Sequence, residues 1–391
     1  MKLIILTSRL PYPIERGDKL RIYHQIRHLS ERHEIYLFAL TDQEVAAADV
    51  AEMQRWCKEV QVHRIRKIGA IWQMLLALFR GWPLQVAYFF RPRLRKQLQQ
   101  LIQRVQPDHL YCQLLRMAPY VKALDLPATL DYMDCFSVGM KRMQASSPWF
   151  WKPIWAWEAR QLLRMEGQMY EAFSHHTIIS AQDRDHLGTP AGAPVEVVPN
   201  GIDLAFFHLP SPPPTPEYDL FFIGNLGYYL NVQAAQYLVQ QVMPLVWEKR
   251  PDTRLLLAGA RPSAEVKALV QDTRVELQAW VPDIRDAYAS GKMLVAPLFH
   301  SIGQQNKILE SMAMEKVCVS TPLVNRAIGA THNETIWMAE DPAGFARQIL
   351  ELLDREAELP QLGAKSRTFV GERFTWEYSV ELLEKLWREE G

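Results

Sequence analysis

Two side chains that could take part in chemistry, Lys307 and Glu310, stand three residues apart after a polar loop. If a helix begins at Asn306, this spacing places the amine and the carboxylate on one face of it. Free amides at the start of a helix favour an anionic group such as phosphate. A carboxylate one turn further along could accept two hydroxyls of a ribose. The candidates for the phosphate side are the loop residues Ser301, Gly303, Gln304, Gln305 and Asn306.

The simpler alternative is an ordinary surface ion pair between Lys307 and Glu310. The residues around them are small or apolar, including Ile308, Leu309 and Met312. We therefore expect a largely buried helix, which favours a binding site over a surface pair.

Two predicted strands would hold this loop and helix in place. The apolar run Met293–Ala296 precedes the loop, and the β-branched run Val317–Ser320 follows a helix predicted over Asn306–Met314. Strand, loop, helix and strand make a βαβ unit. In open parallel sheets, ligands bind at the loop that leaves the carboxyl end of a strand.

The start of the chain has the same order of elements. The apolar run at 3–6 predicts a strand, and a helix is expected over Leu20–Glu31. Gly17 and Asp18 lie between them, where we expect a turn and a helix N-cap. The loop lacks the G-x-G-x-x-G spacing and so does not predict a dinucleotide site.

Other polar residues also follow predicted strands. In the first half, Gln113 follows the strand at 107–112, and Asp131 lies at the end of the strand at 128–133. Carboxylates at the carboxyl end of a parallel strand are candidates for ligand contact. We expect the strand at 176–180 to be the last in this half.

In the second half, three loops have the same position relative to a strand. Gly224 and Asn225 follow the strand at 219–223, and glycine there lets a backbone approach a ligand closely. Arg261 follows the strand at 254–258 and is a candidate cation. Val281 lies at the end of the predicted strand at 275–281.

Three motifs resemble those of retaining glycosyltransferases with the GT-B architecture. They are PYP followed by GDK at 11–19, PNGID at 199–203, and QNKILESMAMEK at 305–316. The third is similar to a run in the sugar transferases associated with exosortase (PEP-CTERM) polysaccharide loci. The resemblance covers nearly the whole chain. It implies an α/β fold of two Rossmann-like domains that face each other across a cleft.

The resemblance also implies a reaction, in which a hexose passes from a UDP- or GDP-sugar to a glycan or lipid-linked acceptor in exopolysaccharide synthesis. Glu310 would hold the ribose, and Lys307 and Arg261 would neutralise the diphosphate. Gln113 and Asp131 would act with Glu310 and Lys307 at the catalytic centre. The implied donor-binding residues are Gly17, Asp18, Gly224, Asn225, Arg261, Val281, Gly303, Gln304, Gln305, Asn306, Lys307 and Glu310.

Three positions depart from the family pattern. Ile302 stands where the broad family has a second glutamate, Gln113 where relatives often have a histidine, and Asn231 where many have a lysine. These departures motivate two alternatives, a non-catalytic GT-B scaffold in a polysaccharide assembly complex and a nucleotide-sugar epimerase.

Composition excludes several other classes of protein. The formal net charge of the 391 residues is zero, so no overall field attracts nucleic acid. The four cysteines are dispersed, which predicts reduced thiols in the cytoplasm instead of disulfides or a zinc site. No metal and no cofactor are expected, and Asp183–Asp185 is interpreted as the start of a helix. We expect no signal peptide and no membrane-spanning segment.

The order of elements predicts two domains. The first spans 1–198 on the acceptor side, and a proline-rich linker spans 199–218. The nucleotide-sugar-binding domain spans 219–371. A C-terminal helix within 372–391 is expected to pack back on the first domain, as the resemblance implies.

Residues 64–96 have an unusual composition. Apolar residues lie on one helical stripe, and cations gather at both ends of the stretch. This pattern is typical of a helix that lies on anionic lipid at the inner face of the cytoplasmic membrane. The alternative is a helix that packs its stripe on its own sheet. The stripe consists of Trp72, Leu75, Leu76 and Phe79, with Arg64, Arg66, Lys67 and Arg80 around it.

Overall fold

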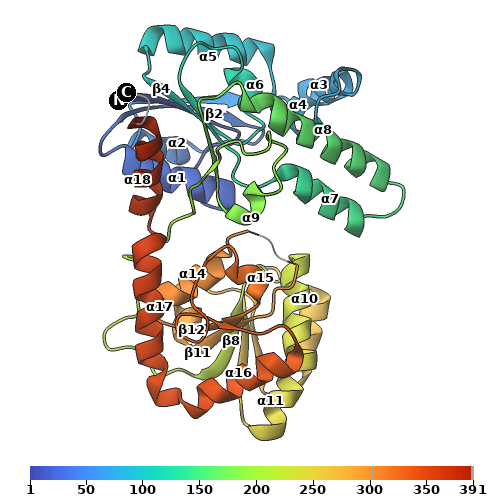
Figure 1. Ribbon diagram of the computed structural model, residues 1–391, viewed down its shortest axis with the longest axis vertical. Coiled ribbons are helices and arrows are strands. Elements are labelled where there is room, and N and C mark those ends of the chain that lie inside the picture. Colours follow the sequence, from blue (N-terminus) through green and yellow to red (C-terminus); the bar gives the residue numbers. More distant parts are fainter. Residues whose placement is uncertain (301–302, 389–391) are drawn as a thin grey trace. The chain divides into compact units, whose positions relative to one another are not determined.

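The computed structural model describes residues 1–300 and 303–388. The chain forms two compact units (Figure 1). The first contains Met1–Pro199 together with Ser379–Gly391, and the second contains Asn200–Tyr378. Ser301 and Ile302, two residues named in the sequence analysis, lie outside the described residues.

The first unit is built on a parallel sheet of seven strands in the order β3-β2-β1-β4-β5-β6-β7. Its central strands are continuous apolar runs because helices cover both faces. The chain moves from β1 to one side and later returns to the other side, so β1 and β4 flank the point where the strand order reverses. The strands are β1 (Lys2–Thr7), β2 (Glu34–Thr41), β3 (Glu59–Arg64), β4 (His109–Gln113), β5 (Ala128–Asp131), β6 (His175–Ile178) and β7 (Glu196–Val197).

Two apolar clusters lie on the two faces of this sheet. One joins α1, α2 and the C-terminal helix α18, through residues such as Ile22, Met53 and Leu383. The other joins α4, α5, α6 and α8. The helices are α1 (Gly17–Leu29), α2 (Ala47–Gln54), α3 (Lys67–Arg80), α4 (Leu84–Phe89), α5 (Pro92–Val105), α6 (Ala118–Val121), α7 (Phe136–Ser146), α8 (Lys152–Tyr170), α9 (Ala181–Arg184) and α18 (Trp376–Arg388).

The second unit has a parallel sheet of six strands in the order β10-β9-β8-β11-β12-β13. Here the strand order reverses between β8 and β11. A single apolar core surrounds this sheet. The strands are β8 (Tyr218–Ile223), β9 (Leu255–Ala258), β10 (Val275–Gln278), β11 (Gly291–Ala296), β12 (Val317–Ser320) and β13 (Trp337–Met338).

Most helices of the second unit connect successive parallel strands (Figure 1). The predicted α/β architecture of two parallel-sheet Rossmann-like domains is thereby confirmed. The helices are α10 (Tyr229–Tyr237), a π-helix (Leu238–Val242), α11 (Met243–Lys249), α12 (Ala264–Lys267), α13 (Ile284–Ala289), α14 (Asn306–Ala313), α15 (Pro322–Asn325), α16 (Pro342–Asp354) and α17 (Leu359–Arg373), with 3-10 turns at Ala268–Gln271 and Glu356–Glu358.

Two expectations about single elements were wrong. Helix α1 begins at Gly17, so Asp18 lies in its first turn and the N-cap is Arg16. Strand β7 follows β6, so 176–180 is not the last strand of its unit. The segment after β12 begins with the short helix α15, which Thr321 caps. Helix α17 was not predicted.

Helix α3 presents its apolar stripe to solvent. Phe79 is 90% exposed, Trp72 61% and Leu75 49%, whereas the face turned to the protein carries the buried Ala70 and Ala77. The alternative in which this stripe packs on its own sheet is therefore wrong. None of the helices described is long and apolar enough to cross a membrane.

Candidate functional site

The candidate site of the second unit lies where the order of its strands reverses. The loop after β8 carries Gly224 and Asn225, and the segment after β11 leads into α14. Both leave the carboxyl ends of adjacent strands, which pair in parallel through Met293 and Leu220. Loops at such a point form the usual ligand crevice of an open α/β sheet.

Lys307 is held within this crevice by an asparagine. Its Nζ lies 2.5 Å from Oδ1 of Asn231 and 4.7 Å from the ring centroid of Phe222. Asn231 in turn donates from Nδ2 to the carbonyl of Asn225 at 2.9 Å. Burial lowers the pKa of Lys307 to about 8, although the carboxylate of Glu310 opposes this shift. The amine of Lys307 is thus held beside the β8 loop by a neutral amide and not by a carboxylate.

Gly224 leaves room for this cation. A Cβ on Gly224 would lie 3.0 Å from Nζ of Lys307 and 2.9 Å from Nδ2 of Asn231. A side chain at this position would therefore crowd both groups. The glycine keeps the backbone of the β8 loop open beside the amine.

Glu310 is anchored by a tyrosine that lies outside every motif found in the sequence. The hydroxyl of Tyr288 donates to its Oε2 at 2.6 Å, and Tyr288 is fully buried. Burial raises the pKa of Glu310, and the bond from Tyr288 and the charge of Lys307 oppose that rise. Within the described part of the chain Lys307 and Glu310 form no direct ion pair, and neither is exposed. The surface-pair alternative is therefore wrong.

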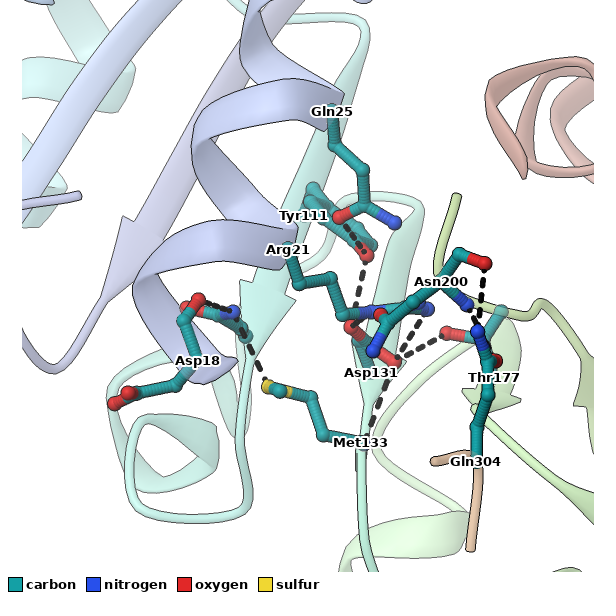
Figure 2. Close-up of polar contacts among 10 residues, drawn as sticks. Asp18, Arg21, Gln25, Tyr111, Asp131, Met133, Thr177, Asn200 and Gln304 are labelled. Carbon is teal, nitrogen blue, oxygen red and sulfur yellow. Dashed lines mark hydrogen bonds and ion pairs between the residues drawn. The ribbon is translucent and has the colours of Figure 1, made fainter. Parts of the chain in front are cut away.

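The glutamines before α14 have different surroundings. Gln304 makes two bonds to the backbone of Asn200, accepting from its N–H at 2.9 Å and donating to its carbonyl at 2.8 Å (Figure 2). Gln304 thus ties the loop to the PNGID segment. Gln305 is the N-cap of α14 but makes no capping bond with its side chain. Gly303 has a φ of 83°, a conformation that favours glycine.

The remaining donor-side candidates border the same loops. Arg261 is exposed, and its carbonyl oxygen would lie 2.6 Å from a Cβ on Gly227, so the β9 loop packs directly on the β8 loop. A backbone bond from Leu226 to Ala260 at 2.9 Å fixes that contact. Val281 lies in the loop after β10, which ends at Gln278.

In the first unit, Asp131 is the centre of a buried network (Figure 2). Its carboxylate accepts from Nε of Arg21 at 2.7 Å, from the Tyr111 hydroxyl at 3.0 Å and from the Thr177 hydroxyl at 3.1 Å. Arg21 and Asp131 are both completely buried. These three bonds occupy the carboxylate oxygens. Asp131 thereby holds the carboxyl ends of β4, β5 and β6 against α1.

The other first-unit candidates lie at the same edge of the sheet. Gln113 is buried and donates from Nε2 to the carbonyl of Asp18 at 2.7 Å, and it also contacts Met133. Asp18 pairs through its side chain with Arg9 at 2.5 Å. Gly17 is exposed at the start of α1, with open space where a Cβ would stand.

The interpretation of Asp183–Asp185 as a helix start is confirmed. Ser180 is the N-cap of α9 and its hydroxyl accepts from the N–H of Asp183. Oδ2 of Asp183 accepts a bond from that hydroxyl at 2.6 Å. Across residues 1–300 and 303–388, no three His, Cys, Asp or Glu side chains are grouped so as to hold a metal ion.

Each half of the chain matches a model of a known protein family. Residues 19–206 match the model of "Glycosyltransferase Family 4", and residues 217–355 match that of "Glycosyl transferases group 1". An "uncharacterized 44.6 kDa protein in cps region" of Klebsiella pneumoniae is 23% identical over 392 residues, which cover 95% of this chain and 96% of that protein.

Solved structures agree with the fold over the full length. Sucrose-phosphate synthase from Thermosynechococcus elongatus has a TM-score of 0.71 at 14% identity, covering 100% of this chain and 99% of that one. HepE of Anabaena, solved in complex with UDP, has a TM-score of 0.67 at 13% identity and full coverage of both chains. TarM has a TM-score of 0.68 at 10% identity, with 99% of each chain covered. One glycosyltransferase family model thus matches each half of the chain, and the fold is that of the GT-B glycosyltransferases throughout.

Proposed function

We propose that the chain transfers a hexose from a UDP- or GDP-sugar to a glycan or lipid-linked acceptor, with retention of configuration. The observation that carries this proposal is the arrangement of Lys307, Glu310 and Gly224 at one crevice. A buried amine, a tethered carboxylate and an open backbone loop there match the diphosphate and ribose of a nucleotide sugar.

In this proposal Glu310 accepts the ribose hydroxyls, and Lys307 with Arg261 neutralises the diphosphate. The amides near Gly303 and Gly224 complete the phosphate contacts, together with Asn225, Gln305 and Asn306. Negative charge grows on the leaving diphosphate as the sugar departs, so cations fixed beside it stabilise the transition state. Fixed cations also supply the charge that a metal ion would otherwise provide. Val281 and its loop would contact the base.

The first unit would receive the acceptor. Asp131 and Gln113 would act there by holding the start of α1, with Gly17 and Asp18, in a fixed position. Asn231, a departure from the family pattern, supports catalysis in this view because it positions Lys307. Two relatives are consistent with the proposal. HepE has been solved with UDP-glucose, and the Klebsiella protein is encoded in a cps region. We therefore place the reaction in the synthesis of a cell-surface polysaccharide.

We further propose that the first unit binds anionic membrane through α3. A basic hollow of about 1140 Å³ lies at the start of this helix, and its lining includes Arg64, Lys67 and Arg91. An apolar groove of about 460 Å³ lies between α3 and the start of α8, lined by Leu75, Ile154 and other residues. Cations beside exposed apolar side chains match a phosphate headgroup joined to lipid chains. The protein would then work at the inner face of the cytoplasmic membrane.

The first experiment tests the donor site by calorimetry with UDP, GDP and 2′-deoxy-UDP. Wild type should bind one ribonucleotide and discriminate against its 2′-deoxy analogue, because a site built for a hydroxyl rejects a ligand that lacks it. Glu310→Ala should bind UDP and 2′-deoxy-UDP equally and weakly, and Arg261→Ala should bind UDP more weakly than wild type. Glu340→Ala, on the surface of the same unit, is the control.

The outcomes separate the candidate functions. If Glu310→Ala and Arg261→Ala both keep wild-type transfer and affinity, the site assignment is wrong. Absence of UDP and GDP binding by wild type would favour the non-catalytic scaffold. Conversion of a nucleotide sugar without any acceptor, seen by product analysis, would instead indicate an epimerase.

A further inference from the structure

An arginine of the first unit has no ion-pair partner among the residues that the structure describes. Arg116 lies in the loop between β4 and α6, and its Nε is buried. It makes no hydrogen bond and no ion pair with any residue that the structure describes. Its guanidinium packs on two rings instead, 4.9 Å from the centroid of Phe136 and 5.4 Å from that of Phe89.

A second guanidinium lies on the same phenylalanine. Arg9, in the loop after β1, has its Cζ 5.8 Å from the centroid of Phe89. One of its nitrogens pairs with Asp18 at 2.5 Å. Desolvation and the positive charges of Arg9 and Arg16 together lower the pKa of Arg116 to about 10, against the attraction of Asp18 and Asp134. Within the described residues, neither of these carboxylates pairs directly with Arg116.

The place of this pair in the fold is that of a ligand site. Arg9 and Arg116 follow β1 and β4, adjacent parallel strands that pair through Leu6 and Cys112. The strand order of the first sheet reverses between these two strands. It is at the carboxyl ends of such strands that open α/β sheets bind ligands.

We propose that Arg116 and Arg9 form an oxyanion subsite that binds a phosphate group of the acceptor. This inference rests on the proposed function, in which the first unit receives the acceptor and the donor diphosphate is held by the second unit. A guanidinium presents parallel N–H groups that match the oxygens of phosphate. The two rings hold the fork of Arg116 in one orientation, and a bound anion supplies the charge that the protein does not. The acceptor is thus a phosphorylated molecule, either a lipid diphosphate or a phosphorylated glycan.

The test is calorimetric titration of the full chain with inorganic pyrophosphate. Lys307→Gln serves as the background, because it removes the candidate phosphate cation of the second unit. In this background Arg116→Met should weaken pyrophosphate binding by about tenfold or more, the usual effect of losing a charge-assisted bond. Arg9→Gln should weaken it to a smaller extent, and Arg116→Lys should keep part of the affinity.

Arg55→Gln is a matched control. Arg55 also lies over an aromatic ring, that of Trp56 at 5.4 Å, but it is exposed and paired with Glu52. Thermal unfolding separates ligand binding from a structural role. Removing an uncompensated cation should leave the melting temperature of Arg116→Met equal to or above that of wild type. Pyrophosphate should raise the melting temperature of the protein that keeps Arg116 and should not raise that of Arg116→Met.

Two further ligands identify the source of the phosphate. Tighter binding of farnesyl diphosphate than of pyrophosphate supports a lipid-linked acceptor, and preference for glucose 1-phosphate supports a phosphorylated glycan. Equal pyrophosphate affinity with and without Arg116 would overturn the subsite. UDP binding is measured separately with Lys307 intact, so its failure would count against the proposed function and not against this subsite.

Discussion

At the scale of single residues, the candidate site depends on groups that are positioned by neighbours. Asn231 holds the amine of Lys307, and Tyr288 holds the carboxylate of Glu310. Both functional groups are partly withdrawn from water, so their charges act through a medium of lower dielectric constant than the solvent. A shifted pKa is the expected consequence.

This shift predicts how nucleotide affinity depends on pH. The pKa of Lys307 is lowered to about 8, so its positive charge is present below that pH and is lost as the pH rises through it. If diphosphate binding needs the cation, UDP affinity should fall about tenfold between pH 7 and pH 9. Calorimetry in buffers of different ionisation enthalpy should show proton uptake on binding near pH 8. Lys307→Arg should remove this pH dependence, and an unchanged profile in that variant would refute the role of Lys307.

The Arg21–Asp131 pair gives a prediction about stability. Both side chains are completely buried, so Asp131→Ala removes the carboxylate that faces a buried guanidinium. Loss of one member of such a pair costs about 3–5 kcal/mol of unfolding free energy. Urea denaturation followed by tryptophan fluorescence measures the change. The exposed Asp125→Ala is the control, and a loss similar to that of the control would show that the network does not stabilise the fold.

At the scale of elements, α3 differs from the other helices of its unit. Most of them cover a face of the sheet, whereas α3 buries mainly alanines and presents large apolar side chains to solvent. An exposed apolar patch of this kind on a protein surface commonly marks an interaction site. Exposed aromatic residues just before α8, Trp149 and Phe150 among them, add to the apolar surface of the first unit.

The measurement for α3 is co-sedimentation with anionic and neutral vesicles at low and high salt. Wild type should bind anionic vesicles, and salt should weaken the binding, since each cation near the surface contributes about 1 kcal/mol. Changing Arg64, Arg66, Lys67 and Arg80 to Gln should reduce binding at least about tenfold. Trp72→Ser with Phe79→Ser should reduce it at all salt concentrations.

A variant with four exposed cations of the second unit changed to Gln is the matched control. In this control Lys249, Lys267, Arg347 and Lys365 are changed to Gln, and it should bind vesicles as wild type does. Equal binding by the α3 variants, or none by wild type, would mean that α3 does not contact lipid.

At the scale of the whole molecule, both units follow one plan. Each has a parallel sheet whose strand order reverses once, and the candidate residues lie at or after the carboxyl ends of its strands. The first unit is not continuous in sequence, because the chain leaves it at Pro199 and returns at Ser379. The returning part of α18 completes its core through Val380, Leu383 and Trp387.

Substitution of Trp387 tests whether α18 completes the core of the first unit. Its indole N–H donates to the hydroxyl of Thr129 at 2.9 Å, and its ring lies 5.1 Å from that of His109. Trp387→Ala should cost about 3–5 kcal/mol through the cavity that it leaves. Because two units need not unfold together, hydrogen exchange of their separate strands is the appropriate measurement. Protection should fall in β4 and β5 and not in β8 and β11. Tyr378→Ala, at a more exposed position, is the control.

Much of the fold could be predicted from local patterns. Apolar runs of four to six residues identified the central strands, and strand–loop–helix order identified two parallel-sheet domains. The spacing of Lys307 and Glu310 placed both on α14. Helix α17 was missed because it contains Pro360, Gly363 and Gly371. Gly363 is required there by packing, since a Cβ would lie 1.9 Å from the carbonyl oxygen of Glu315.

The sequence by itself thus determined the class of fold, the loops that carry the candidate residues and the amphipathic character of α3. These follow from the periodicity of apolar residues and from glycine and proline, which act over a few positions in the chain. Only the tertiary structure decided which atoms meet. Asn231 reaches Lys307 across 76 positions, and Asp131 reaches Arg21 across 110. Such contacts depend on strand order and on which helix face is buried, and no local pattern specifies either of them.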